Sequence, residues 1–166
     1  MAISNLPTIP LVVFGVLEPA MLIWAYIVAL RDTPSFYIAQ APNFPLPADA
    51  EVPPHGLVLL LQLVNVYVLL AAIAVVCSFT PHASVSRGYL IAVAFADYGH
   101  IWAVYKALGA ELFWDVGSWN DMIWGSIAVS AVLNVLRWLT VAGAFGALRD
   151  ARDPTAAAAG VTKKRA

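Results

Sequence analysis

The sequence has little charge and almost no cysteine. Of its 166 residues, 61% are hydrophobic, 11% are charged and one is a cysteine. A single cysteine excludes an intramolecular disulfide, and Cys77 lies in an apolar run, where a small buried residue is commoner than a reactive thiol. The apolar fraction exceeds the roughly one half that is usual for soluble domains, so the composition is typical of a membrane protein.

Common sequence motifs for cofactors and nucleic acids are also missing. No glycine-rich loop joins a predicted strand to a helix, and no basic face suits nucleic acid. His55, His82 and His100 fall in two loops and a helix centre, without HxxxH or CxxC spacing. We therefore expect no metal, no other cofactor and no nucleic-acid partner.

The N-terminal region does not have the pattern of a signal peptide. Residues 1–10 contain no lysine or arginine. The apolar run that follows, 11–30, is longer than a typical h-region and contains Glu18 and Pro19. We expect this run to be a retained helix.

Four apolar segments lie at about 11–30, 57–79, 89–108 and 122–148, and each is long enough for a bilayer-spanning helix, which needs about 17 to 25 residues. A proline-rich loop separates the first two, whereas short connections predict that the later helices are antiparallel neighbours. The sequence thus predicts an all-α four-helix transmembrane bundle in residues 1–148. We expect residues 149–166 to form a flexible basic tail.

The distribution of charge predicts the orientation of this bundle. Both termini and the short 80–88 loop must share one side, which carries most of the basic residues: Arg87, Arg149, Arg152, Lys163, Lys164 and Arg165. The positive-inside rule places that side in the cytosol. The last four residues, KKRA, resemble a dilysine signal for return to the endoplasmic reticulum, so we expect a multi-pass protein of that membrane. A basic stop-transfer flank is the alternative interpretation.

Polar residues in the four segments lie at similar depths. Glu18 and Asp97 lie about 12 Å from the cytosolic helix ends, at 1.5 Å per residue. Asn134, Arg137 and Asn65 fall at about 12 to 20 Å. Ionisable residues at such depth are costly unless they face other protein groups or a wet cavity. We therefore predict one interior polar layer.

Spacing within the helices supports this prediction. Asp97 and His100 are three residues apart and share a helix face. The same holds for Gln62 with Asn65, and for a stripe in the fourth helix: Ser126, Ser130, Asn134 and Arg137. We expect these faces to turn inward. Trp102 and Trp138 lie within about a turn of the layer, and their ring faces attract cations.

Two interpretations of the layer remain open. Arg137 could neutralise a carboxylate only to fix helix register, since buried ion pairs need not have another role. However, one arginine faces two acids, and two acids in unequal environments are the usual components of a proton donor and acceptor. On this functional reading the candidate catalytic residues are Glu18, Asp97 and His100, and the candidate substrate-binding residues are Asn65, Trp102, Asn134, Arg137 and Trp138.

Three stretches carry a family resemblance. They are Leu17-Glu18-Pro19, Asp97-x-Gly99-His100 with Tyr105-x-x-Leu108-Gly109, and Trp119-Asn120-x-Met122-x-Trp124-Gly125. Together they resemble a family of small fungal integral-membrane proteins of unknown function. This resemblance implies four transmembrane helices and a fungal source, but no activity. In architecture alone the chain is similar to the EXPERA proteins, which include sterol isomerases and sigma-2-type receptors.

Three functions compete at this point. The first is an enzyme without a cofactor, an isomerase or cyclase, that acts by proton transfer on a lipophilic sterol, terpenoid or polyketide. The second is a non-catalytic protein that binds a sterol-like lipid or a partner helix, including a second copy of itself. A transporter ranks third, because four helices without an internal repeat would need to oligomerise to form a pore.

Overall fold

The computed structural model describes residues 4–47 and 50–150, and its regular elements are all helical. Three helical segments are long and apolar enough to cross a membrane: Thr8–Arg31, Pro54–Ser78 and Asp121–Val141. They suggest a membrane protein. Most of the predicted tail, including the KKRA sequence, lies outside the described residues.

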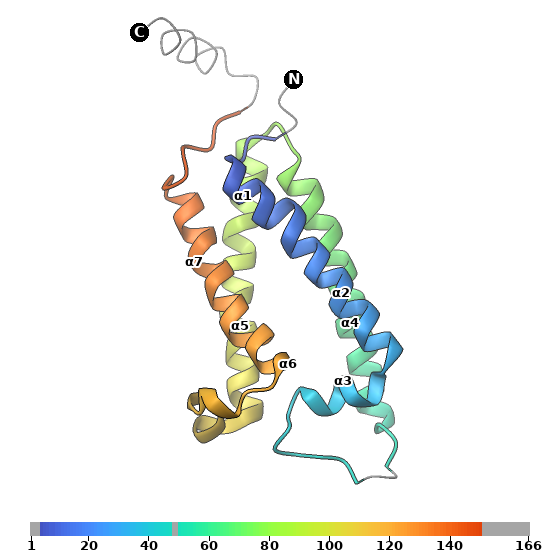
Figure 1. Cartoon of the computed structure of the whole chain (residues 1–166). Helices are drawn as coiled ribbons and strands as arrows, with labels where there is room; N and C mark the ends of the chain where they lie inside the picture. The colour runs from blue at the N-terminus through green and yellow to red at the C-terminus, as the bar shows by residue number, and fades with distance from the viewer. Residues whose placement is uncertain (1–3, 48–49, 151–166) are drawn as a thin grey trace, which may run out of the picture.

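The first segment is one continuous rod built from three elements (Figure 1). These are α1 (Thr8–Val12), the π-helical turn η1 (Val13–Leu17) and α2 (Glu18–Arg31). Pro19 takes an early position in α2, where its missing N–H is tolerated.

A short helix, α3 (Thr33–Ala39), follows directly and occupies part of the predicted proline-rich loop. Asp32 caps it, because its Oδ1 accepts a hydrogen bond of 3.1 Å from the Ser35 amide. The hydrogen bonds with Ser35 hold the pKa of Asp32 below its usual range. The chain therefore turns sharply at the end of α2.

The two central helices are α4 (Pro54–Ser78) and α5 (Ala83–Trp114). The predicted segment 89–108 lies within α5 and ends directly before Gly109, where a φ of 77° interrupts the helical geometry. Although α5 is the longer helix, it is not among the three apolar candidates, since Asp97 and His100 lower its mean hydropathy. The structure therefore shows three apolar spans where the sequence predicted four.

The last segment is also helical but shorter than predicted. It follows the 3-10 turn η2 (Val116–Ser118). Its elements are α6 (Asp121–Ile123), the π-helical turn η3 (Trp124–Val129) and α7 (Ser130–Val141). The prediction that it extends to residue 148 is wrong. Gly143 and Gly146 adopt φ angles of 84° and 118°, which a right-handed helix cannot accommodate.

The helices form two pairs, in which α2 packs along α4 and α5 packs along α7 (Figure 1). The pairs meet where α4 turns into α5, next to α1. We call this the terminal end, because residues 4–6 and 148–150 also lie there. Leu6, Phe14, Leu90 and Leu148 form much of its buried core.

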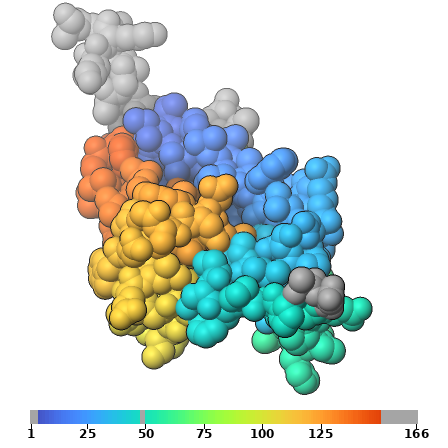
Figure 2. Space-filling model, turned by 60° about the horizontal axis from the view of Figure 1, so that its bottom comes forward, coloured from blue at the N-terminus to red at the C-terminus, as the bar shows by residue number. Residues whose placement is uncertain are grey.

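The opposite end of the molecule is closed by a different contact. Figure 2 shows the segment of α3 and the following residues, in cyan, beside the segment that contains α6. Three amide side chains connect the two helix pairs here. Asn120 Nδ2 donates to Ala39 O at 3.1 Å, Asn43 Nδ2 to Leu108 O at 3.4 Å, and Gln40 Nε2 to the sulfur of Met122 at 3.4 Å. We call this the strap end.

Candidate functional site

An ion-pair centre joins three helices near the terminal end. Arg137 of α7 is 1% exposed and lies between two carboxylates. Its Nη2 donates to Glu18 Oε1 of α2, and its Nη1 donates to Asp97 Oδ2 of α5 at 3.2 Å. The side chains of Glu18 and Asp97 are 10% and 13% exposed. The interior therefore holds one cation and two acids in direct contact.

Asn134 holds the α5 side of this centre in place. It lies one turn before Arg137 on α7 and is buried. Its Nδ2 donates to Ala94 O at 2.7 Å and lies 3.5 Å from Asp97 Oδ2. Ala94 and Asp97 are also three residues apart. The spacing of the two acceptors on α5 therefore equals the spacing of the two donors, Asn134 and Arg137, on α7.

The helix geometry before Glu18 is irregular. In η1 the Glu18 amide donates to Val13 O, five residues back, and the following residue is a proline without an N–H. Single π-helical turns often occur at functional sites because they re-aim the next side chain. The π turn and Pro19 thus interrupt the regular α-helical hydrogen bonding on both sides of Glu18.

Two contributing residues were missed by the sequence reasoning. The Phe14 ring lies under the Arg137 guanidinium, with 5.0 Å from Cζ to the ring centroid. The buried Tyr89 phenol lies close to Arg137 and Glu18. Both could have been found from spacing, because Phe14 is four residues before Glu18 and Tyr89 is eight before Asp97, so each pair shares a helix face.

Other predicted site residues do not join the centre. His100 and Asn65 are exposed, and Trp102 is 63% exposed. Trp138 is partly exposed, and its Nε1 donates to Tyr98 Oη at 2.9 Å. The prediction that Asn65 turns inward is wrong, because α4 buries the adjacent Val64 instead, about 100° away around the helix.

The charge balance determines what the centre can do chemically. With both carboxyl groups ionised, the three side chains carry one excess negative charge, whereas with one shared proton they are neutral. A neutral cluster is far cheaper to bury than a charged one. Burial therefore favours the state in which one of the two acids retains a proton.

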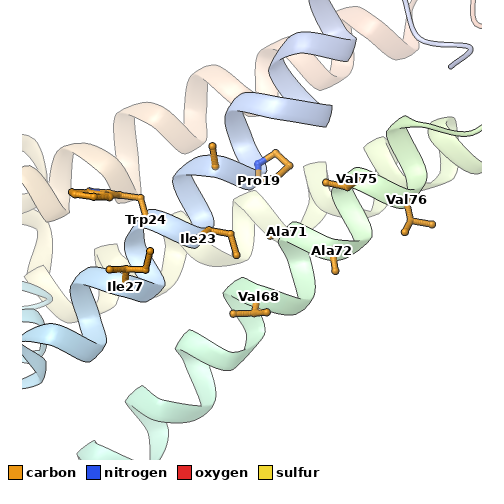
Figure 3. A pocket seen from close by; sticks show the side chains of 10 residues that line it. Pro19, Ile23, Trp24, Ile27, Val68, Ala71, Ala72, Val75 and Val76 are labelled. Atoms are coloured by element: carbon orange, nitrogen blue, oxygen red, sulfur yellow. The ribbon is translucent and has the colours of Figure 1, made fainter. Parts of the chain in front are cut away.

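An apolar groove begins next to the centre. It has a volume of about 720 Å³ and lies between α2 and α4. Figure 3 shows its lining on facing turns of the two helices: Pro19, Ala20, Ile23, Trp24, Ile27, Val68, Ala71, Ala72, Val75 and Val76. Pro19 is the neighbour of Glu18 in sequence, so the groove begins at the turn of α2 that carries the acid.

Comparison with known proteins gives one family. A family model described as a domain of unknown function (DUF7704) matches residues 3–147. The chain matches no curated protein and no solved structure. The match agrees with the predicted resemblance to a family of unknown function. The fungal source and the likeness to EXPERA proteins stay predictions.

Proposed function

Because the chain belongs to the DUF7704 family, whose description assigns no activity, we propose a function from the site itself: proton transfer to a lipophilic substrate within a membrane. The substrate would be a sterol-, terpenoid- or polyketide-like molecule, and the reaction an isomerisation or cyclisation without a cofactor. One observation carries this proposal. Two carboxyl groups share a single buried guanidinium, which favours a cluster that retains one proton.

The proposed roles follow from accessibility. Asp97 is the favoured donor, because its side chain is somewhat more exposed than that of Glu18 and because His100 lies exposed one turn away on the same face. His100 would relay the proton. Glu18, Asn134 and Arg137 orient the donor and balance its charge. Trp102 or Trp138 would face the cation that develops on the substrate.

A membrane arrangement is part of this proposal. The two long helices of each pair would cross the bilayer, with α5 as the fourth span and its Asp97 side chain largely shielded from lipid by protein. The terminal end would lie on the cytosolic side of the endoplasmic reticulum membrane, as the distribution of arginine and lysine favours. Protease digestion of a C-terminal epitope in sealed microsomes would test the orientation, and protection of the epitope would contradict it.

The test compares cellular lipids in a strain that lacks the gene with strains that carry variants. We expect a lipophilic precursor to accumulate in the deletion strain and in a strain with Asp97→Asn, and to disappear with the wild-type protein. Asp115→Asn is the matched control, since Asp115 is an exposed acid outside the centre. Normal lipids with both Asp97→Asn and Glu18→Gln would contradict proton transfer by these acids.

A second candidate function is non-catalytic binding of a lipid, and the groove between α2 and α4 favours it. Its lining residues are entirely apolar, so a sterol or acyl chain suits it better than a polar ligand. In the same experiment a binding protein leaves no accumulated precursor after deletion. The purified protein would then retain a lipid that the variant Ala72→Trp loses.

A further inference from the structure

Four buried side-chain atoms lack a hydrogen-bond partner among the described residues. They are Asn5 Oδ1, Ser78 Oγ, Glu18 Oε2 and Arg137 Nε. Buried polar atoms without a partner are costly, and in native proteins such atoms are commonly satisfied by internal water. All four belong to the terminal end of the molecule, which makes their relative positions informative.

Ser78 lies next to the segment that ends in Glu18. A Cβ atom placed on Gly15 would lie 3.1 Å from the Ser78 Cβ, so the two backbones approach closely. Gly15 is one turn before Glu18, within η1. Ser78 therefore lies within about one helical turn of Glu18, at the contact between η1 and α4.

A hydrogen-bonded chain continues from Ser78 towards the surface. Ser86 Oγ donates to the carbonyl of Cys77 at 2.7 Å, and it accepts a bond of 2.8 Å from Asn5 Nδ2. Ser86 is fully buried, whereas Asn5 is partly exposed. Ser4 also joins this chain, because its Oγ donates to Ser78 O at 2.5 Å.

Tyr89 connects this chain to the ion-pair centre. It lies one turn after Ser86 on α5, so the two side chains share a face. Its phenol lies close enough to Arg137, Glu18 and Cys77 to interact with all three side chains. Hydroxyl groups thus follow one another from the surface at Asn5 to the buried guanidinium.

We propose that a file of water molecules runs from Asn5 past Ser86, Ser78 and Tyr89 to the Glu18–Arg137 ion pair, and supplies the centre with protons from the aqueous phase. The bound water satisfies the four unpaired atoms. The use of this path as a proton supply rests on the proposed function, whereas the path itself does not. Each hydroxyl can both donate and accept, which a relay along a file of water requires.

The test measures hydrogen exchange at Arg137, because a guanidinium has exchangeable protons whatever the state of the carboxyl groups. In nitrogen-15-labelled full-length protein in lipid nanodiscs, the Nε–H signal of Arg137 is assigned by its loss in Arg137→Lys. We expect Tyr89→Phe, which removes one hydroxyl, to slow its exchange at least about tenfold. Tyr98→Phe is the control, since Tyr98 is on the same helix but 51% exposed.

A second variant protects the test against a folding defect. Ser78→Ala removes the unpaired hydroxyl without adding atoms at this tightly packed position, and is expected to slow the exchange similarly. Slow exchange in the wild-type protein would overturn the proposal, because the centre would then be dry. Fast exchange that neither variant changes would overturn it too, since water would then arrive by another route. Neither result depends on whether the protein is an enzyme.

Discussion

The two ends of the molecule join the same helix pairs by different chemistry. At the terminal end, the Arg137 guanidinium bridges the carboxyl groups of Glu18 and Asp97, and all three side chains are largely buried. At the strap end, neutral amides of Asn43 and Asn120 bond to backbone carbonyls in partly buried positions. Buried charge must be paired, whereas a half-exposed amide can bond to water instead. The terminal end should therefore tolerate substitution far less than the strap end.

The largest expected effect comes from removing the shared cation. Arg137→Met leaves two buried carboxyl groups without their partner, and loss of one member of a buried ion pair costs about 3 to 5 kcal/mol. The free energy of unfolding in mixed micelles measures this loss. Arg87→Met is the matched control, because Arg87 is exposed on α5, and we expect it to change stability by less than about 0.5 kcal/mol.

The same site allows a sharper test of the comparison. Replacing the whole centre, with Arg137→Met, Glu18→Gln and Asp97→Asn together, removes every charge. Neutral or apolar replacements of a complete ion cluster are often tolerated, so the triple variant should regain much of the lost stability. If the triple variant is as unstable as Arg137→Met alone, packing around the guanidinium, including Phe14, outweighs its charge.

A smaller effect should distinguish two glycines. A Cβ on Gly15 would lie 3.0 Å from Phe79 Cε2 and 3.1 Å from Ser78 Cβ, whereas a Cβ on Gly99 meets no atom within 4 Å. Gly15→Ala should therefore cost about 1 to 3 kcal/mol through overpacking. Gly99→Ala should stabilise α5 by about 0.5 to 1 kcal/mol, because alanine favours a helix. Equal effects in chemical unfolding would mean that the terminal end is not tightly packed.

The difference in cost between a buried charge and a neutral amide also explains which site residues could be predicted from the sequence. Glu18, Asp97 and Arg137 could be brought together from depth alone, since a charge inside an apolar helix has few tolerable places. Asn65 could not be placed in this way, because the free-energy cost of a neutral amide is small enough for its side chain to face either the interior or the outside of the bundle. The early end of α7 was missed because apolar residues continue beyond Val141, although Gly143 and Gly146 adopt positive φ angles that a right-handed helix cannot accommodate.

The smallest expected effect is at the strap end, where Asn120 has two roles that can be separated. Its Oδ1 accepts from the Ile123 amide at 2.9 Å and caps α6, while its Nδ2 donates to Ala39 O across the helix pairs. Asn120→Asp keeps the cap and loses only the donor, which should cost about 0.5 to 1.5 kcal/mol. Asn120→Ala loses both and should cost about 1 kcal/mol more. If Asn120→Asp instead destabilised the protein as much as Arg137→Met, the strap end would also depend on a buried polar bond, and the contrast between the two ends would be wrong.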